Sequence, residues 1–164
     1  MKNSLYLPIL RRELFLFRYS NMNMQQLRDI LTDNNLKITP QRMAVMQAVI
    51  RLKDHPTVDN VLEFLKKDHP NIAIGTVYKI LETLVAKGII RKVKTDKDIM
   101  RYDAITERHH HLYCNESERI EDYYDEDLNG IIEEHFTKKG IPGFEIKDIR
   151  LQIIGKFTKP GKIC

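Results

Sequence analysis

A change of hydrophobic period at Gly88 constrains the fold of this chain more than any other feature of its sequence. Between residues 24 and 87, apolar residues recur at spacings of three and four, which is typical of helices with one buried face. Beyond Gly88 the period becomes two, over residues 89–94 and again over 99–103, and this period predicts two strands. The polar residues between them predict the turn of a β-hairpin.

Capping residues and helix breaks divide the part before Gly88 into several short helices. Thr39 and Thr57 suit the N-cap position, and Pro40 suits the first helical turn. Helices followed by a hairpin are the order of a winged helix-turn-helix DNA-binding domain, whose last helix enters the major groove. We assign this domain to residues 24–103, with helices that begin near Met24, Pro40, Val58 and Ile74.

Residues 104–164 predict a second, smaller domain. Period-two patterning over 109–124 predicts two strands around a polar turn, and the acids at 125–127 favour the start of a helix. Apolar residues from Ile146 to Ile154 predict a final strand. Such a module is too thin to bury its sheet alone, so we expect a dimerisation domain. The predicted fold class is α+β, with an N-terminal winged helix-turn-helix domain followed by a small α/β dimerisation domain.

The first 23 residues stand outside both predicted domains. Met22 and Met24 directly precede the first helical pattern, so we interpret residues 1–23 as an extension that a later start codon would leave out. The apolar residues near the start faintly resemble a secretory signal, but Pro8 and the pair Arg11-Arg12 interrupt them. No apolar run approaches the ~20 residues of a membrane-spanning helix. We therefore expect a cytoplasmic protein with no membrane partner.

Charge is distributed unevenly along the chain. The formal net charge is +4. Residues 35–103 hold thirteen Lys and Arg against eight Asp and Glu, whereas residues 104–164 hold nine against twelve. A basic first part suggests a domain that faces nucleic acid. We expect no enzyme, because the chain has neither a His-Glu-x-x-His motif nor a glycine-rich phosphate loop.

A run of three histidines is the strongest indication of a metal site. In an extended strand His109 and His111 share one face, and His110 takes the other. Asp103 and Asp122 could add oxygen ligands, and such a set suits Fe(II), Mn(II) or Zn(II). The alternative is a solvated surface run without a metal.

Other residues have simpler interpretations when they are taken alone. His55 and His69 each precede a proline, as loop histidines often do, and His135 lies on an apolar helix face, as expected of a core or interface residue. The two cysteines, Cys114 and Cys164, form no Cys-x-x-Cys pair, so no disulfide framework is encoded.

The ordered motifs between Leu36 and Phe157 resemble those of ferric uptake regulators and their peroxide-sensing relatives. The motifs are Leu36–Arg42, His55-Pro56-Thr57, Thr76-Val77-Tyr78, Arg101-Tyr102-Asp103, His109–Cys114 and Gly143–Gly155. The resemblance implies a two-domain homodimer that represses double-stranded promoter DNA when loaded with Fe(II) or Mn(II), with Zn(II) as a further candidate.

The resemblance also implies the functional residues. It places the regulatory metal site on His55, Asp103, His109, His111 and Asp122, and DNA contacts on Arg42, Thr76, Tyr78, Lys79, Lys92 and Lys94. An aspartate as the last ligand is similar to the peroxide-sensing branch, in which bound Fe(II) reacts with peroxide and a ligand histidine is oxidised. His55 and His109 match the positions of oxidation. For Tyr78 the alternative is a packing role.

The chain departs from the family pattern at the structural zinc site. The usual Cys-x-x-Cys pairs are missing, since Ser117 stands where the partner of Cys114 is expected and Phe157 and Pro160 occupy the positions of the second pair. We therefore expect no structural four-cysteine zinc, with packing around Phe157 in its place.

A second metal site of iron-sensing members also departs from the pattern. Arg108, Asn129 and Ile149 fall where ligands are expected, and only His110 remains. The expectation is one metal per subunit. Two alternatives stay open: a family member that binds DNA constitutively, and a metal-buffering or hydrolytic protein without promoter specificity.

Overall fold

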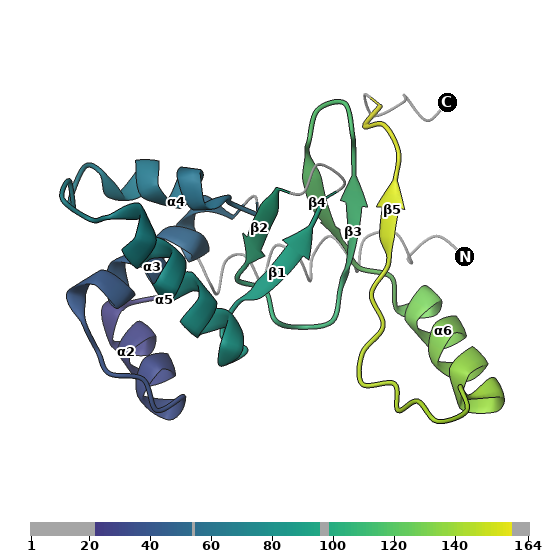
Figure 1. The fold of residues 1–164 in the computed structure, drawn as a ribbon. Coiled ribbons are helices and arrows are strands. Elements are labelled where there is room, and N and C mark those ends of the chain that lie inside the picture. The colour runs from purple at the N-terminus through teal and green to yellow at the C-terminus, as the bar shows by residue number, and fades with distance from the viewer. Residues whose placement is uncertain (1–21, 54, 96–98, 159–164) are drawn as a thin grey trace. The chain divides into compact units, whose positions relative to one another are not determined.

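The computed structural model describes residues 22–53, 55–95 and 99–158, which form two units separated between Glu107 and Arg108. Most of the predicted N-terminal extension lies outside the described residues. The first unit contains, in chain order, α2 (Met24–Asp33), α3 (Pro40–Leu52), α4 (Val58–Leu65), α5 (Ile74–Ala86), β1 (Arg91–Lys94) and β2 (Met100–Asp103) (Figure 1). The second contains β3 (His110–Tyr113), β4 (Ile120–Tyr123), α6 (Glu126–Lys139) and β5 (Gln152–Ile154).

Side-chain caps begin most helices of the first unit at the predicted positions. The Thr39 hydroxyl accepts a hydrogen bond from the backbone N–H of Arg42, and the Thr57 hydroxyl accepts one from that of Asn60. Each such cap contributes about 1 kcal/mol. Helix α5 is the exception, because its N-cap residue, Ala73, offers no side-chain acceptor. The predicted helix starts in this unit are confirmed.

Helix α3 lies at the centre of the core of the first unit. Its buried residues are packed with apolar side chains from the other three helices and with Tyr102 of β2. Strands β1 and β2 pair antiparallel, with Lys92 opposite Tyr102, which confirms the predicted hairpin. The buried Tyr102 therefore fastens the hairpin to the helices. The buried residues of α3 are Met43, Ala44, Val45, Met46, Ala48, Val49 and Ile50.

The second unit is built on a three-stranded sheet of order β4-β3-β5 (Figure 1). Strand β3 pairs antiparallel with β4 and parallel with β5. The final strand is shorter than expected, since only Gln152–Ile154 forms it, and the positive φ of Gly143 turns the chain before it. The rest of the predicted strand, from Ile146 to Leu151, is irregular, because its pairing with β3 begins only at Leu151.

Apolar side chains remain exposed in the second unit. No residue of α6 is buried, all of β5 is exposed, and Ile131 and Phe144 each expose 65% of their surface. His135, expected in a core or an interface, is exposed on α6 within this unit. Among the described residues no helix is long and apolar enough to span a bilayer.

Candidate metal centre

His55 lies in the loop between α3 and α4 with an unusual backbone conformation. Its φ is +48°, in the left-handed region that a non-glycine residue adopts at some cost. The loop is tied to β2, because the guanidinium of Arg101 donates to the His55 carbonyl at 3.2 Å and Tyr102 N–H donates to the Pro56 carbonyl at 2.9 Å. These bonds hold the buried His55 ring beside the end of β2.

Asp103 ends strand β2 and is also buried. Its Oδ1 accepts a hydrogen bond of 2.7 Å from the backbone N–H of Ile105, which forms a tight turn after the strand. The turn uses only this oxygen and fixes the carboxylate of Asp103. Loop and strand together make His55 and Asp103 a buried pair in the first unit.

His109, His111 and Asp122 form a second buried set, inside the second unit. Nε2 of His109 lies 3.1 Å from Nε2 of His111, and the two rings meet edge to face. Asp122 stands opposite His111 in the β3–β4 register, and its Oδ1 lies 3.5 Å from Nε2 of His109. The alternation expected for the histidine run is confirmed, because His109 and His111 meet.

The chemistry of this set fits a metal ion. Imidazole nitrogens lie about 2.1 Å from bound Zn(II), so two nitrogens less than about 4.2 Å apart can contact one ion. The two Nε2 atoms, which lie 3.1 Å apart, are within this limit. Two imidazoles and a carboxylate suit Fe(II), Mn(II) and Zn(II).

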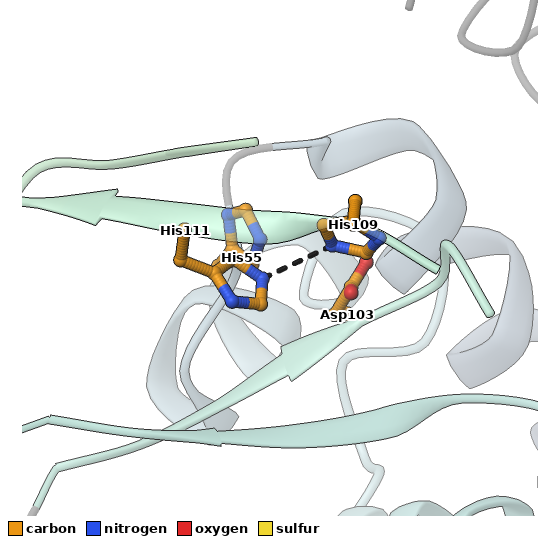
Figure 2. Close-up of side chains that lie close together, drawn as sticks. All are labelled: His55, Asp103, His109 and His111. Carbon is orange, nitrogen blue, oxygen red and sulfur yellow. Dashed lines mark hydrogen bonds between the residues drawn. The ribbon is translucent and has the colours of Figure 1, made fainter. Parts of the chain in front are cut away.

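A group of His and Asp side chains that could bind a metal is present among the described residues. It consists of His55, Asp103, His109 and His111, all four of them buried (Figure 2). The dashed line in Figure 2 is the contact between His109 and His111. Four of the five residues that the resemblance implied as ligands belong to this group, and the fifth, Asp122, contacts His109.

The expected DNA contacts lie on α3, on α5 and on the hairpin. Tyr78 exposes 48% of its surface, which argues against the packing role considered for it. Lys79 and Lys94 are exposed, and Thr76 lies partly buried in the first turn of α5. The Arg42 guanidinium donates to the Lys37 carbonyl, and Lys92 forms an ion pair of 2.7 Å with Glu82.

The sequence interpretation missed Glu82. It lies on α5 four residues after Tyr78, and thus on the same helix face. Besides its pair with Lys92, it contacts the Tyr102 hydroxyl; burial, together with the nearby Glu82 carboxylate, raises the pKa of Tyr102 to about 12. The i, i+4 spacing from Tyr78 is a signal that could have identified it.

The model of the ferric uptake regulator family matches residues 33–154, about three quarters of the chain. The chain belongs to the ferric uptake regulator family. The peroxide-responsive repressor PerR of Staphylococcus saprophyticus is 30% identical over 135 residues, which cover 79% of this chain and 88% of that protein.

Solved structures of this family share the fold. A Campylobacter jejuni peroxide stress regulator is 27% identical, with a TM-score of 0.62 and coverage of 85% of this chain and 98% of that one. The Helicobacter pylori ferric uptake regulator Fur is 22% identical, with a TM-score of 0.67 and coverage of 82% and 93%. The predicted fold class, an N-terminal DNA-binding domain and a C-terminal dimerisation domain, is confirmed by these likenesses.

This family member differs from the expected family pattern around Cys114. The thiol is buried, and a hydrogen bond with the Ser117 hydroxyl is the largest of several that lower its pKa. The guanidinium of Arg119 lies 4.5 Å from the centroid of the Phe157 ring. Contacts between protein groups therefore occupy the positions where the family pattern places cysteines.

Proposed function

We propose that this family member is a metal-dependent repressor in which one Fe(II) or Mn(II) ion per subunit binds His55, Asp103, His109, His111 and Asp122. The observation that carries the proposal is the buried set of His109, His111 and Asp122, in which the two Nε2 atoms lie 3.1 Å apart. Membership of the family supports it. Zn(II) has the same ligand preferences and remains a candidate ion.

The ligands come from both units, and this arrangement is what makes regulation feasible. His55 and Asp103 belong to the first unit, and the other three ligands belong to the second. A bound ion supplies positive charge that holds these imidazoles and carboxylates together. When all five bind the same ion, the two units take one relative orientation, and this orientation sets where α5 stands in a dimer.

The DNA-binding surface that we propose consists of α5 and the hairpin. Tyr78 and Lys79 are exposed on α5, where they can reach base edges in the major groove. Arg42, Lys92 and Lys94 supply phosphate contacts, and Thr76 lies in the first turn of α5.

A homodimer would cover exposed apolar residues of the second unit such as Ile131 and Ile154. Repression of promoter DNA places the protein in the cytoplasm.

DNA binding that depends on metal is the first test. Fragments selected from the source genome with Mn(II)-loaded protein provide the probe. We expect chelation to lower the affinity by at least about ten-fold, the usual size of allosteric coupling. His111→Ala should bind as weakly with Mn(II) as the wild type does with chelator. His135→Ala, which changes an exposed histidine, is the control.

Two results would contradict this proposal. Equal binding with and without chelator would favour the alternative of a constitutive DNA-binding protein. Metal binding without any selected fragment would favour the alternative of a metal buffer without promoter specificity.

We propose further that the site responds to peroxide. The likeness to a peroxide-responsive repressor and the aspartate at position 122 support this subclass. Peroxide should add one oxygen atom to peptides that contain His55 or His109 when Fe(II) is bound. Peptide mass spectrometry of the Fe(II)-loaded protein checks this, and the Mn(II)-loaded protein is the control. Iron sensing would be favoured by two results together. Peroxide would leave the histidines of the iron-loaded protein unmodified, and the protein would dissociate from DNA when iron is chelated but not when peroxide is added.

A further inference from the structure

Helix α6 contributes no buried residue to the second unit. Polar contacts connect it to the strands instead. Asp125, its N-cap, accepts hydrogen bonds from Leu128 N–H at 2.9 Å and from the Tyr123 hydroxyl at 2.7 Å. About two turns further along, Glu133 forms an ion pair with Arg108, which directly precedes the histidine run.

His110 supplies the buried member of these contacts. Its side chain is fully buried, and its Nδ1 accepts a hydrogen bond of 3.1 Å from the backbone N–H of Leu151. The proton of a neutral ring in this arrangement is therefore on Nε2. On α6, the side chain of Asn129 lies close to the His110 ring. Nε2 of His110 and Oδ1 of Asn129 are both buried, and neither has a hydrogen-bond partner among the described residues.

These contacts lie on the face of the sheet opposite the candidate ligands. Successive side chains of a strand alternate between faces, and the rings of His109 and His111 meet each other. Leu151 forms two hydrogen bonds with β3. Its N–H donates to Nδ1 of His110, and its carbonyl accepts from His111 N–H at 3.0 Å. One backbone position thus contacts both histidines.

We propose that Arg108, His110, Asn129 and Glu133 form a metal-independent clasp that fastens α6 and β5 to β3 and thereby holds His109 and His111 in position for the metal. The metal part of this inference rests on the proposed function; the clasp itself does not. These are the positions at which the family pattern led us to expect a lost metal site. The protein has replaced a metal there by contacts among its own side chains. His110 is a positioning residue and makes no contact with the ion.

The experiment compares two substitutions of His110. His110→Asn keeps an acceptor where Nδ1 stands, because Oδ1 and Nδ1 are attached to equivalent carbon atoms. His110→Leu leaves Leu151 N–H buried without its acceptor. Thermal unfolding with chelator measures the clasp, and Mn(II) titration well below the unfolding temperature measures the positioning of the ligands.

We expect His110→Leu to lower the unfolding temperature of the metal-free protein by roughly 5–10 °C. Its Mn(II) affinity should fall by about ten-fold, which is the lower end of the losses that follow when a residue orienting a metal ligand is replaced. His110→Asn should recover most of both losses. Wild-type Mn(II) affinity in a folded His110→Leu variant would overturn the proposal, whether or not its unfolding temperature falls.

A matched pair on α6 separates the clasp from the metal. Glu133→Gln removes the ion pair with Arg108, whereas Glu134→Gln removes only a pair with Lys138 within the helix. Because the Glu133 pair is exposed, we expect a fall of only about 2–4 °C for Glu133→Gln. Glu134→Gln should change less. Equal effects of the two substitutions would overturn the clasp. If the wild-type protein bound no Mn(II), the proposed function would be refuted. Comparison of Glu133→Gln with Glu134→Gln would still test the clasp.

Discussion

The two units of the chain are stabilised in different ways. The first has a core of buried apolar residues from four helices, three of which begin with a side-chain cap, and Tyr102 attaches the hairpin to it. The second has an exposed helix, an exposed edge strand and polar contacts around the buried His110. The first unit therefore has the contacts to keep its shape unaided, whereas the second depends on the clasp and, in our proposal, on a metal and a partner subunit. In our proposal, three of the five metal ligands therefore lie in the unit with fewer buried apolar residues.

The largest expected effect tests this contrast directly. Leu81 is fully buried in α5, so Leu81→Ala should lower the free energy of unfolding of the first unit by about 2–5 kcal/mol. Ile131 exposes 65% of its surface, so Ile131→Ala should change the intrinsic stability of the second unit by less than about 0.5 kcal/mol. Hydrogen exchange of individual amides resolves the two units.

The dependence on protein concentration provides the control. If Ile131→Ala lowers stability only at protein concentrations where the dimer forms, the substitution weakens the dimer interface. This result leaves the contrast between the two units unchanged. A loss of the size of the Leu81→Ala effect at every concentration would contradict the contrast, since it would require a packed core beneath α6.

Local signals account for the parts of the fold that the sequence predicted well. The hydroxyls of Thr39 and Thr57 accept hydrogen bonds from N–H groups only three residues further along the chain. Helix starts could therefore be predicted from short segments of sequence. The hairpin follows from alternation and a polar turn. The final strand was predicted too long, because its pairing with β3 joins residues about forty positions apart and depends on where the intervening chain returns.

The candidate site shows the same division. Alternation alone placed His109 and His111 together, as the contact between their rings confirms. His55 alone has the features of a loop histidine, and only the family resemblance identified it as a ligand. The partner of His110 lies at Leu151, and the partner of Arg108 lies at Glu133. Neither pair has a local signal, since each depends on how α6 and β5 return to β3.

The smallest expected effect concerns a polar contact of the first unit. Nζ of Lys92 lies 2.7 Å from Oε1 of Glu82, so a cation that we propose for DNA phosphate is paired with an acid of α5. In the second unit the comparable pair, Arg108 with Glu133, joins the residue before the histidine run to α6, none of whose residues is buried. We therefore expect the pair in the first unit to adjust DNA affinity and to contribute little to stability.

Glu82→Gln should release Lys92 and raise DNA affinity by a few-fold at low salt, while the free energy of unfolding changes by less than about 0.5 kcal/mol. One additional phosphate contact should also steepen the slope of log affinity against log salt by about 0.9. Fluorescence anisotropy over a salt series measures both quantities. Glu63→Gln makes the same charge change at an exposed position on α4 and is the control. If both variants gain DNA affinity equally, the change in net charge is the cause. If Glu82→Gln instead lowers the free energy of unfolding of the first unit as much as Leu81→Ala does, the Glu82–Lys92 pair is structural. The first unit would then also depend on a polar contact, which would contradict the contrast between the units.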